Sequence, residues 1–406
     1  MLEHSNDWEK VRLGDVGYVQ MCRRIFQHQT KDVGDIPFFK IGTFGQAPDA
    51  FISRELFEDY KSRYPFPRKG DVLLSAAGTI GRALVFDGSD SYYQDSNIVW
   101  LKTDDSVIDS TYLWWVYRSY PWRCLEGTTI SRLYNYIILN TVIYLPSLKE
   151  QKAIAKTLTA FDEIISSLNG LILKNQNIRH GALENLVTGA IRLKETKCKW
   201  RKASFDELVA PKARIGWQGL KTEEYLRQGY SYLISGSNFV DGHIDIDNLW
   251  YVSKDRYDMD LNIQVNSGDV LVSKDGTIGK VAIVQPIDRP ATLNSGVFVF
   301  KTKEGLNSYY LYRLLQSSVF TNFIQVLSAG STIKHLYQKD LKHFEFTVPE
   351  DIEEQQEIAS TIQSIDDEIE SLKSERDKWI QIREAAMNDL LTGRIRLNLG
   401  DEACQA

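Results

Sequence analysis

The chain has 406 residues, which is enough for two or three domains with separate cores. Hydrophobic residues make up 43% of it and charged residues 25%, a composition that argues against intrinsic disorder and against a fibrous protein. No run approaches the roughly eighteen apolar residues of a membrane-spanning helix, and the N-terminus does not resemble a signal peptide. The four cysteines lack C-x-x-C spacing. We expect a cytoplasmic protein without a membrane anchor, zinc site or disulfide framework.

The net charge of −6 is unevenly distributed along the sequence. Residues 350–397 carry six basic and 13 acidic side chains, a net charge of −7. Residues 194–349 carry 20 basic and 17 acidic side chains, a net charge of +3, and residues 1–148 carry 16 basic and 18 acidic ones. The acidic excess therefore belongs to one C-terminal segment, and the rest of the chain can present basic patches to a nucleic acid.

Residues 1–147 predict a first domain of mixed α/β type. Short β-forming runs at 36–41 and 71–75 are separated by Gly and Asp turn signals, and an aromatic run at 112–117 predicts a helix. The cluster Gly78-Thr79-Ile80-Gly81 follows the second β-forming run.

Residues 148–193 predict a spacer helix. Apolar residues recur there at intervals of four and three, which is the seam of a coiled coil: Ile154, Leu158, Phe161, Ile165, Leu168 and Ile172. Ser147 and Glu150 have the spacing of a capping box, and Gly189 suits a left-handed C-terminal turn. A helix of about 40 residues would be roughly 60 Å long.

The remaining sequence repeats this order. The repeated motifs are Gly70–Ser75 with Gly268–Ser273, Gly78–Gly81 with Gly276–Gly279, Glu150-Gln151 with Glu354-Gln355, and Leu186–Leu193 with Leu390–Leu397. We expect a second domain at 194–349, a C-terminal spacer helix at 350–397 and a tail at 398–406. The second seam is Ile358, Ile362, Ile365, Ile369 and Leu372. Two copies of this size exclude a solenoid or propeller.

The second spacer helix shares the devices of the first. Asp351 and Glu354 have capping-box spacing, and Gly393 stands at the predicted end. Arg179 and Arg383 occupy matching seam positions, where polar residues commonly fix register. Because each helix alone would expose an apolar stripe, the two helices should pack on each other. The fold class is thus an α/β (mixed α+β) tandem duplication, in which two globular domains are joined by two long helices with approximate two-fold symmetry.

The Gly-Thr-Ile-Gly clusters do not have the spacing of a P-loop, nor of a dinucleotide-binding turn. Two interpretations remain open: a strand-turn-strand corner that needs glycine, or a turn whose N–H groups meet a DNA phosphate. The six histidines show no metal-ligand spacing, and Asp366-Asp367 is interpreted as part of a solvated helix face. We find no candidate catalytic residue and no candidate metal site.

Binding is the remaining kind of function. Basic and polar residues cluster at predicted turns in corresponding places of both domains, and such side chains can read base edges or contact phosphates. The predicted DNA-binding residues are Arg23, Arg24, Lys40, Thr43, Thr79, Arg82, Arg132 and Tyr134 in the first domain, and Lys212, Arg214, Ser237, Asn238, Lys274, Thr277, Lys280, Lys334 and His335 in the second.

These motifs resemble the specificity subunit of type I restriction-modification systems. Gly-Asp-Val-Leu followed by Gly-Thr-Ile-Gly is similar to the signature of its target-recognition domains, and the block from Gln355 to Leu397 resembles its helical regions. The first domain departs from the family pattern at Phe39–Thr43 and Gln94–Asn97.

The resemblance implies a non-catalytic subunit in which two target-recognition domains read a bipartite, asymmetric site in double-stranded DNA. Two antiparallel helices would set the gap between the half-sites. The implied partners are two modification (methyltransferase) subunits, which bind S-adenosylmethionine and methylate adenine, and ATP-dependent restriction subunits that translocate and cleave DNA. No cofactor is expected in this chain itself, and no membrane partner. The alternatives are a coiled-coil assembly protein whose heads bind proteins, and a self-contained DNA-modifying enzyme.

Overall fold

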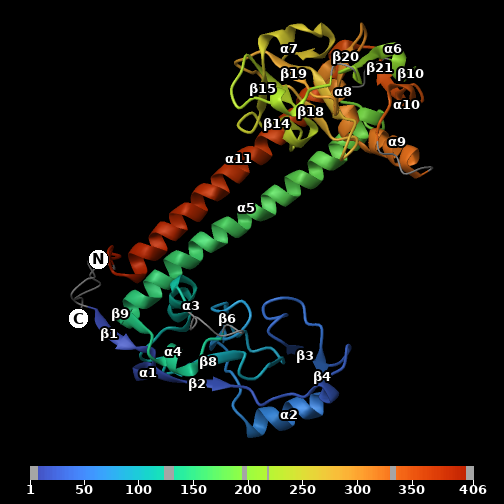
Figure 1. The fold of residues 1–406 in the computed structure, drawn as a ribbon. Coiled ribbons are helices and arrows are strands. Elements are labelled where there is room, and N and C mark those ends of the chain that lie inside the picture. Colours follow the sequence, from blue (N-terminus) through green and yellow to red (C-terminus); the bar gives the residue numbers. More distant parts are fainter. Residues whose placement is uncertain (1–7, 123–131, 194–198, 217–218, 330–334, 399–406) are drawn as a thin grey trace. The chain divides into compact units, whose positions relative to one another are not determined.

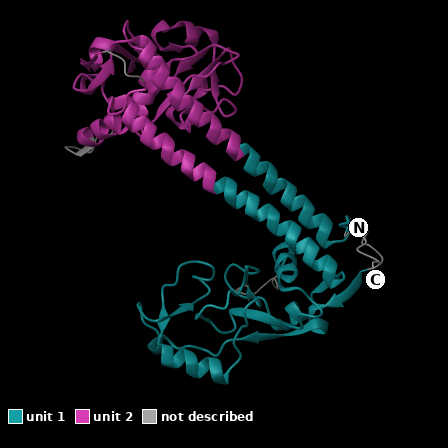
Figure 2. Cartoon of the chain, turned by 180° about the vertical axis from the view of Figure 1, so that it is seen from behind, with its two compact units in different colours: residues 1–169, 374–406 teal, residues 170–373 magenta. Residues whose placement is uncertain are grey.

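The computed structural model describes residues 8–122, 132–193, 199–216, 219–329 and 335–398 (Figure 1). The chain divides into two compact units (Figure 2). Unit 1 contains residues 1–169 and 374–406, and unit 2 contains residues 170–373. Each unit consists of one globular head and about half of each of two long helices, α5 (Leu148–Thr188) and α11 (Ile352–Leu391).

The head of unit 1 is built from three small sheets. β1 (Glu9–Arg12) pairs with β9 (Val142–Leu145). A four-stranded sheet has the order β2 (Gly17–Met21), β8 (Ile98–Thr103), β5 (Val72–Ser75), β6 (Ala83–Val85), and a three-stranded sheet has the order β4 (Phe51–Ile52), β3 (Ile36–Phe39), β7 (Tyr92–Tyr93). The helices are α1 (Leu13–Val16), η1 (Gln27–Gln29), α2 (Arg54–Arg63), α3 (Ser110–Ser119) and α4 (Asn135–Leu139).

The head of unit 2 repeats this plan. β10 (Trp200–Ser204) pairs with β21 (Glu345–Pro349). The larger sheets have the orders β11 (Val209–Ala213), β20 (Val297–Thr302), β17 (Val270–Ser273), β18 (Val281–Ile283) and β15 (Trp250–Val252), β12 (Ser231–Ile234), β19 (Ala291–Leu293), β16 (Gln264–Val265). The other elements are α6 (Phe205–Leu208), η3 (Thr222–Glu224), η4 (Gly236–Asn238), β13 (Phe239–Val240), β14 (His243–Ile244), α7 (Lys254–Asp258), η5 (Leu261–Ile263), α8 (Ser308–Gln316), α9 (Ser318–Ala329) and α10 (Gln338–Leu341).

The matching strand orders confirm the tandem duplication and the mixed α/β fold. Relative to the first head, the second adds the edge strand β16 and the short β13–β14 hairpin. The helix predicted at 112–117 is α3, and α8 is its counterpart in the second head. In the described ranges, no helix combines the length and the apolar character that a membrane crossing requires.

In each head, the four-stranded sheet that contains β5 or β17 is buried on both faces. In the first head, Leu73 and Trp100 pack against the three-stranded sheet, whereas Val72 and Leu74 pack on the helix side. In the second head, Leu271 likewise packs against the other sheet, whereas Val270 and Val272 pack on the helix side. Successive side chains of a strand alternate between faces, so a strand covered on both sides must be a continuous apolar run. This requirement explains the duplicated Val-Leu-Leu and Val-Leu-Val sequences.

The two long helices have the lengths that the sequence predicts, 41 residues for α5 and 40 for α11. Each is followed by a glycine in the left-handed region, Gly189 with φ 73° and Gly393 with φ 70°. A side chain at Gly189 would also collide with the Trp200 ring, whose nearest atom lies 3.0 Å from the position of an added Cβ. Glycine therefore serves both the backbone conformation and the close contact.

The predicted capping boxes are wrong in the role they give to the glutamates. Glu354 does not return to the start of α11; its carboxylate accepts hydrogen bonds from Nε and Nη2 of Arg192, at 2.7 and 2.8 Å, just beyond the end of α5. Glu150 accepts the equivalent two bonds from Arg396, beyond the end of α11. A bidentate arginine outcompetes a single backbone N–H for a buried carboxylate because both groups are charged and their shapes match. Each helix start is therefore joined to the end of the other helix.

The glutamine that follows each of these glutamates binds the head. The Gln151 side chain accepts from the Asp109 N–H at 2.8 Å and donates to the carbonyls of Val107 and Pro146. Gln355 makes the equivalent bonds with Asn307, Gly305 and Pro349. Both glutamines are buried, so their polar atoms need these partners. The glutamine thus fixes the start of each helix to its own head, and the glutamate joins it to the segment that follows the other helix.

The predicted seam residues are buried or half-buried, but they do not all serve the helix pair alone. Ile154 and Leu158 belong to the core of the first head, and Ile358 and Ile362 belong to that of the second. Farther along, Ile165, Leu168, Ile172 and Ile369 are buried, and Phe161, Ile365 and Leu372 are half-buried. Within unit 1 the Phe161 ring lies 5.9 Å from that of Trp379. The start of each helix is thus a part of its head.

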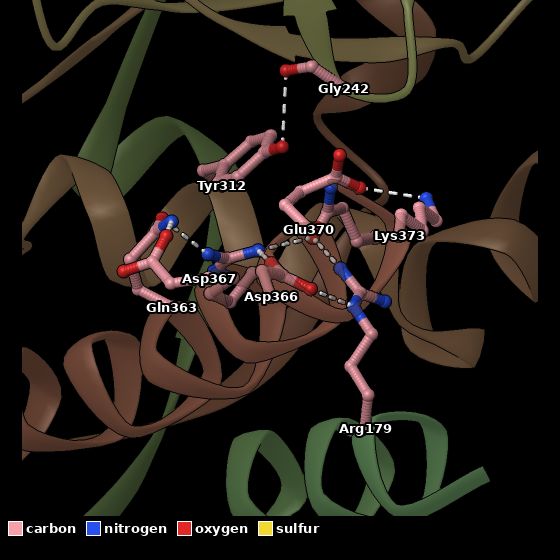
Figure 3. Close-up of polar contacts among 10 residues, drawn as sticks. Arg179, Gly242, Tyr312, Gln363, Asp366, Asp367, Glu370 and Lys373 are labelled. Carbon is pink, nitrogen blue, oxygen red and sulfur yellow. Dashed lines mark hydrogen bonds and ion pairs between the residues drawn. The ribbon is translucent and has the colours of Figure 1, made fainter. Parts of the chain in front are cut away.

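The polar seam positions are occupied by arginines that share a carboxylate with the head. Asp366 of α11 accepts from Arg179 of α5 at 2.5 Å and from Arg313 of α8 at 2.6 Å (Figure 3). In unit 1, Asp162 accepts in the same way from Arg383 and Arg118, at 2.7 and 2.5 Å. These pairs run in opposite sequence directions, so the helices are antiparallel. The interpretation of Asp366 as solvated is wrong, because two guanidinium groups cover it.

Replacing Asp366 by asparagine should destabilise unit 2. The change keeps the shape but removes the charge that neutralises Arg313, whose side chain is 3% exposed. We expect the free energy of unfolding to fall by about 2 to 4 kcal/mol, less than for a fully buried pair because Asp366 is 26% exposed. The control is Glu368→Gln, which makes an equal charge change at an exposed position of α11. This variant should alter the free energy of unfolding by less than about 0.5 kcal/mol. Urea denaturation followed by tryptophan fluorescence measures both, and equal effects would contradict the role of Asp366.

Candidate nucleic-acid interface

Internal hydrogen bonds fix the conformation of the duplicated Gly-Thr-Ile-Gly turns. In the second head, the Ser273 hydroxyl donates to the Thr277 carbonyl at 2.5 Å and accepts from the Lys280 N–H at 2.9 Å. Ser75 makes the same two bonds with Thr79 and Arg82. All four glycines have positive φ, from 62° to 85°, as the corner interpretation requires. The turn therefore has a fixed shape and presents its tip, with Thr79 or Thr277, to solvent.

In the second head this turn borders a hollow of about 670 Å³. β12 and β19 are parallel neighbours, so the segments that follow them leave the sheet at the same edge. These segments, the glycine turn, the segment before β12 and the start of β15 form the wall: Tyr225, Ser235, Gly236, Ser237, Trp250, Asp275, Gly276, Thr277, Lys280, Asn294 and Gly296. The structure thus brings together Ser237, Thr277 and Lys280, which the sequence predicted as DNA-binding residues.

The side chains in and around this hollow differ in their hydrogen-bond and ion-pair partners. Lys280 is exposed, and its ammonium group has no hydrogen bond or ion pair with any residue that the structure describes, as expected of a cation that meets a ligand. The Ser237 hydroxyl shares a hydrogen bond of 2.7 Å with that of Ser235. Neither His335 nor Lys274 lines the hollow: His335 lies 2.6 Å from Asp275, which does line it, and Lys274 lies over the Phe298 ring. Charge and hydrogen-bonding groups therefore line one concave edge.

Two aromatic residues of the hollow were missed by the sequence analysis. The rings of Tyr225 and Trp250 meet edge to face at 6.0 Å, and the guanidinium of Arg227 lies 4.0 Å from the centre of the Trp250 ring. Aromatic faces beside basic groups are common in nucleic-acid interfaces. Nothing in the local sequence marks these residues, because β15 and the segment before β12 meet only in the folded head.

Apart from Arg23 and Arg24, the predicted residues of the first head lie at the equivalent edge, but several of them bind other residues of the head. Arg82 donates Nη1 to the Phe44 carbonyl at 2.7 Å, and Arg132 donates Nη2 to the Ser96 carbonyl at 3.0 Å. Lys40 pairs with Asp49 at 2.9 Å, and the Thr43 hydroxyl accepts from the Lys40 N–H at 3.1 Å. These contacts shape the edge and partly neutralise its charge. Tyr134 is exposed and stacks with Tyr136.

Arg23 and Arg24 line a separate hollow of about 470 Å³ in the first head. Arg24 pairs with Asp95 at 2.7 Å, and the guanidinium of Arg23 lies 5.2 Å from the centre of the Tyr64 ring. Asp95 was not among the predicted site residues. Cys22 also borders this hollow, but burial raises the pKa of its thiol to about 12, so it stays protonated at neutral pH.

Besides Lys274 and His335, three predicted contacts that the structure describes in the second head do not line the hollow. Arg214 is 3% exposed, donates to the Leu293 carbonyl at 2.9 Å, and has its pKa lowered by burial, so it is a core residue. Asn238 is buried and closes its own turn by accepting from the Ser235 N–H. The structure therefore does not support either as a DNA contact. Lys212 is exposed on β11 but does not line the hollow, and Lys334 lies outside the described residues.

Comparisons with known proteins agree on one family. The family model of the type I restriction modification DNA specificity domain matches residues 5–175 and 221–378, more than half of the chain. A putative type I restriction enzyme specificity subunit of Haemophilus influenzae is 51% identical over 158 residues, which are 39% of this chain and 41% of that protein. The MjaVIII specificity subunit of Methanocaldococcus jannaschii is 26% identical over 98% of this chain and 95% of its own length.

A solved structure has the same fold. The type I restriction-modification S subunit of M. genitalium superposes with a TM-score of 0.59 at 16% identity, over 96% of this chain and 98% of the other. At that identity the likeness concerns the fold alone. It covers both heads and both long helices.

Removing the Ser273 hydroxyl, which fixes the glycine turn, should destabilise the second head more than removing the exposed side chain of Lys280. Ser273→Ala deletes two hydrogen bonds at a buried position and should lower the free energy of unfolding by about 1 to 3 kcal/mol. Lys280→Ala should change it by less than about 0.5 kcal/mol. Denaturant titrations of both variants measure the difference. A destabilisation by Lys280→Ala as large as that by Ser273→Ala would mean that the lysine is structural.

Proposed function

The chain belongs to the type I restriction-modification DNA specificity family, and we therefore propose that it is the subunit that selects the DNA sequence for such a system. The observation that carries the proposal is the duplication. Two heads of the same topology present polar and basic side chains at the same edge, and the family model matches the chain twice. Each head then reads one half of a bipartite, asymmetric site in double-stranded DNA.

The two heads differ at this edge, which suits two different half-sites. Asp275 and His335 of the second head stand where the first head has Ala77 and Arg132, as the two isolated bridges show. Arg82 is bound to Phe44, whereas its counterpart Lys280 projects into the hollow. Base edges are distinguished by their pattern of donors and acceptors. Heads with one backbone and different edge side chains would therefore recognise different sequences.

The chemistry is assigned to partner subunits. We propose that two modification subunits bind S-adenosylmethionine and methylate adenine, and that restriction subunits use ATP to translocate and cleave DNA. The role of this chain is to hold both readers and the partner subunits in register through α5 and α11. The complex would act on DNA in the cytoplasm.

Sequencing of methylated adenines in cells with and without this gene tests the proposed function directly. We expect a bipartite motif with a fixed gap that disappears when the gene is deleted and returns with a plasmid copy. An unchanged methylome in a strain whose partner genes are intact would refute the proposal. A self-contained enzyme would instead methylate DNA as the purified chain, without its partners.

Lys280→Ala should weaken binding of the assembled methyltransferase complex to its specific duplex. If the lysine contacts a phosphate, the slope of log affinity against log salt concentration should become smaller by about one, with similar losses on all sequences. Lys254→Ala is the control, because this exposed lysine of α7 does not line the hollow and pairs with Asp258. Fluorescence anisotropy at several salt concentrations measures both. Equal salt slopes for the wild type and Lys280→Ala would remove Lys280 from the phosphate contacts.

Lengthening both spacer helices by one heptad should change the gap and preserve both half-sites. Seven residues inserted after Asn169 and after Lys373, where the two units meet, keep the seam in phase. The helices would become about 10 Å longer, roughly three base pairs of DNA. Methylome sequencing reads the new gap. An unchanged gap would contradict the role of the helices as the spacer.

A further inference from the structure

Arg24 differs from the other arginines that the structure describes in this head in the guanidinium nitrogen from which it donates a hydrogen bond. Its Nε donates to Asp95 Oδ2 at 2.7 Å, and its two terminal nitrogens have no hydrogen bond with any residue in the described ranges. Arg82 and Arg132 instead use terminal nitrogens to bind backbone carbonyls. Holding a guanidinium through Nε fixes its plane and leaves a fork of two parallel donors. The Arg24 side chain is 60% exposed, so this fork is accessible.

The residue before Asp95, Gln94, is fixed to the edge of the sheet. Gln94 donates its N–H to the Phe39 carbonyl at 2.9 Å, and its side chain accepts from the Ile41 N–H at 2.9 Å. In the second head, Asn294 donates to Ile234 in the same way, and Asn294 lines the hollow there. Asp95 therefore follows the sheet edge that forms the candidate interface in both heads.

The backbone next to Asp95 is strained. Ser96 has φ 43°, a conformation that is uncommon outside glycine, and Arg132 binds its carbonyl. Asp95 is only 18% exposed. A short carboxylate on a fixed turn has little freedom, so it can orient the arginine without a large loss of entropy on binding.

The surroundings of the fork suit a flat polar ligand. The hollow of about 470 Å³ is lined by Arg23, Phe26 and Tyr64 as well as by the ion pair. In DNA, guanine presents two acceptors, O6 and N7, at the major-groove edge, and an arginine fork matches both. Adenine presents a donor beside its N7, so it cannot accept both bonds.

We propose that Arg24 is the residue with which the first head reads a guanine, and that Asp95 is its positioning residue. The two terminal nitrogens donate to O6 and N7 of the base, while Nε stays bound to the carboxylate. This inference rests on the proposed function, because it assigns a base to one of the two readers.

The test measures base discrimination by the complete methyltransferase complex. Anisotropy competition gives the affinity for the specific duplex and for duplexes carrying every single base-pair substitution in both half-sites. Wild-type protein should discriminate at a G·C pair in the half-site of the first head by about ten- to one-hundredfold. Arg24→Ala should lose that discrimination at that pair and keep it at all others. Asp95→Asn, which retains an acceptor oxygen, should lose a part of it at the same pair.

Two further variants separate a base contact from a simple charge. Arg24→Lys keeps the charge but has no fork, so it should lose most of the discrimination. Arg54→Ala removes an exposed arginine that also pairs with a carboxylate, Asp90, but does not line the hollow, and should change nothing. Circular dichroism and complex assembly check that each variant folds.

The inference is overturned if Arg24→Ala leaves discrimination intact at every position, or weakens all sequences equally as loss of a phosphate contact would. It is equally overturned if the affected pair is not G·C, or if Arg24→Lys behaves as wild type. Failure of the proposed function looks different: the wild-type complex itself would then bind all the duplexes alike.

Discussion

Within each unit, the two long helices are joined by carboxylates that bind arginines from a second element. Glu150 and Glu354 stand at the starts of the long helices and bind the arginines beyond the ends of the opposite helices. Twelve residues farther along each helix, Asp162 and Asp366 bind one arginine from the partner helix and one from the head. A carboxylate held away from water is tolerated only with such partners, and removal of one partner leaves an uncompensated charge. Helix register and head orientation within each unit are therefore set together.

This arrangement explains why the repeated motifs are repeated. Glu150 and Glu354 need an Ile-Arg-Leu segment after the end of the other helix, and each copy of the repeat supplies one partner of each of these ion pairs. The apolar core continues the same connection, since Ile154 and Leu158 pack with Leu390 and Leu391 in the first head. A substitution in one copy of the repeat would thus also remove a contact of a residue in the other copy. The edge residues that differ between the heads carry no such coupling and are free to diverge.

The sequence predicted the features that depend on periodicity and backbone conformation. The 41- and 40-residue helices, their terminal glycines and the doubly buried strands follow from spacing and from positive φ. It could not predict which polar residues are used internally. Arg214 and Asn238 resemble surface residues in the sequence, but they lie against β19 and within a closed turn. The partners of Glu150, and the pairing of Arg24 with Asp95, depend on contacts between residues 246 and 71 positions apart. Such long-range contacts leave no local pattern.

If each head recognises one half-site, replacing one head should change only the half-site that this head recognises. The most direct measurement replaces the first head, residues 8–147, by the corresponding head of a related specificity subunit that recognises another sequence, followed by sequencing of methylated adenines. We predict that one half of the bipartite motif changes to that of the donor, while the other half and the gap stay as they are. A motif that changes in both halves, or in neither, would contradict the assignment of one half-site to each head.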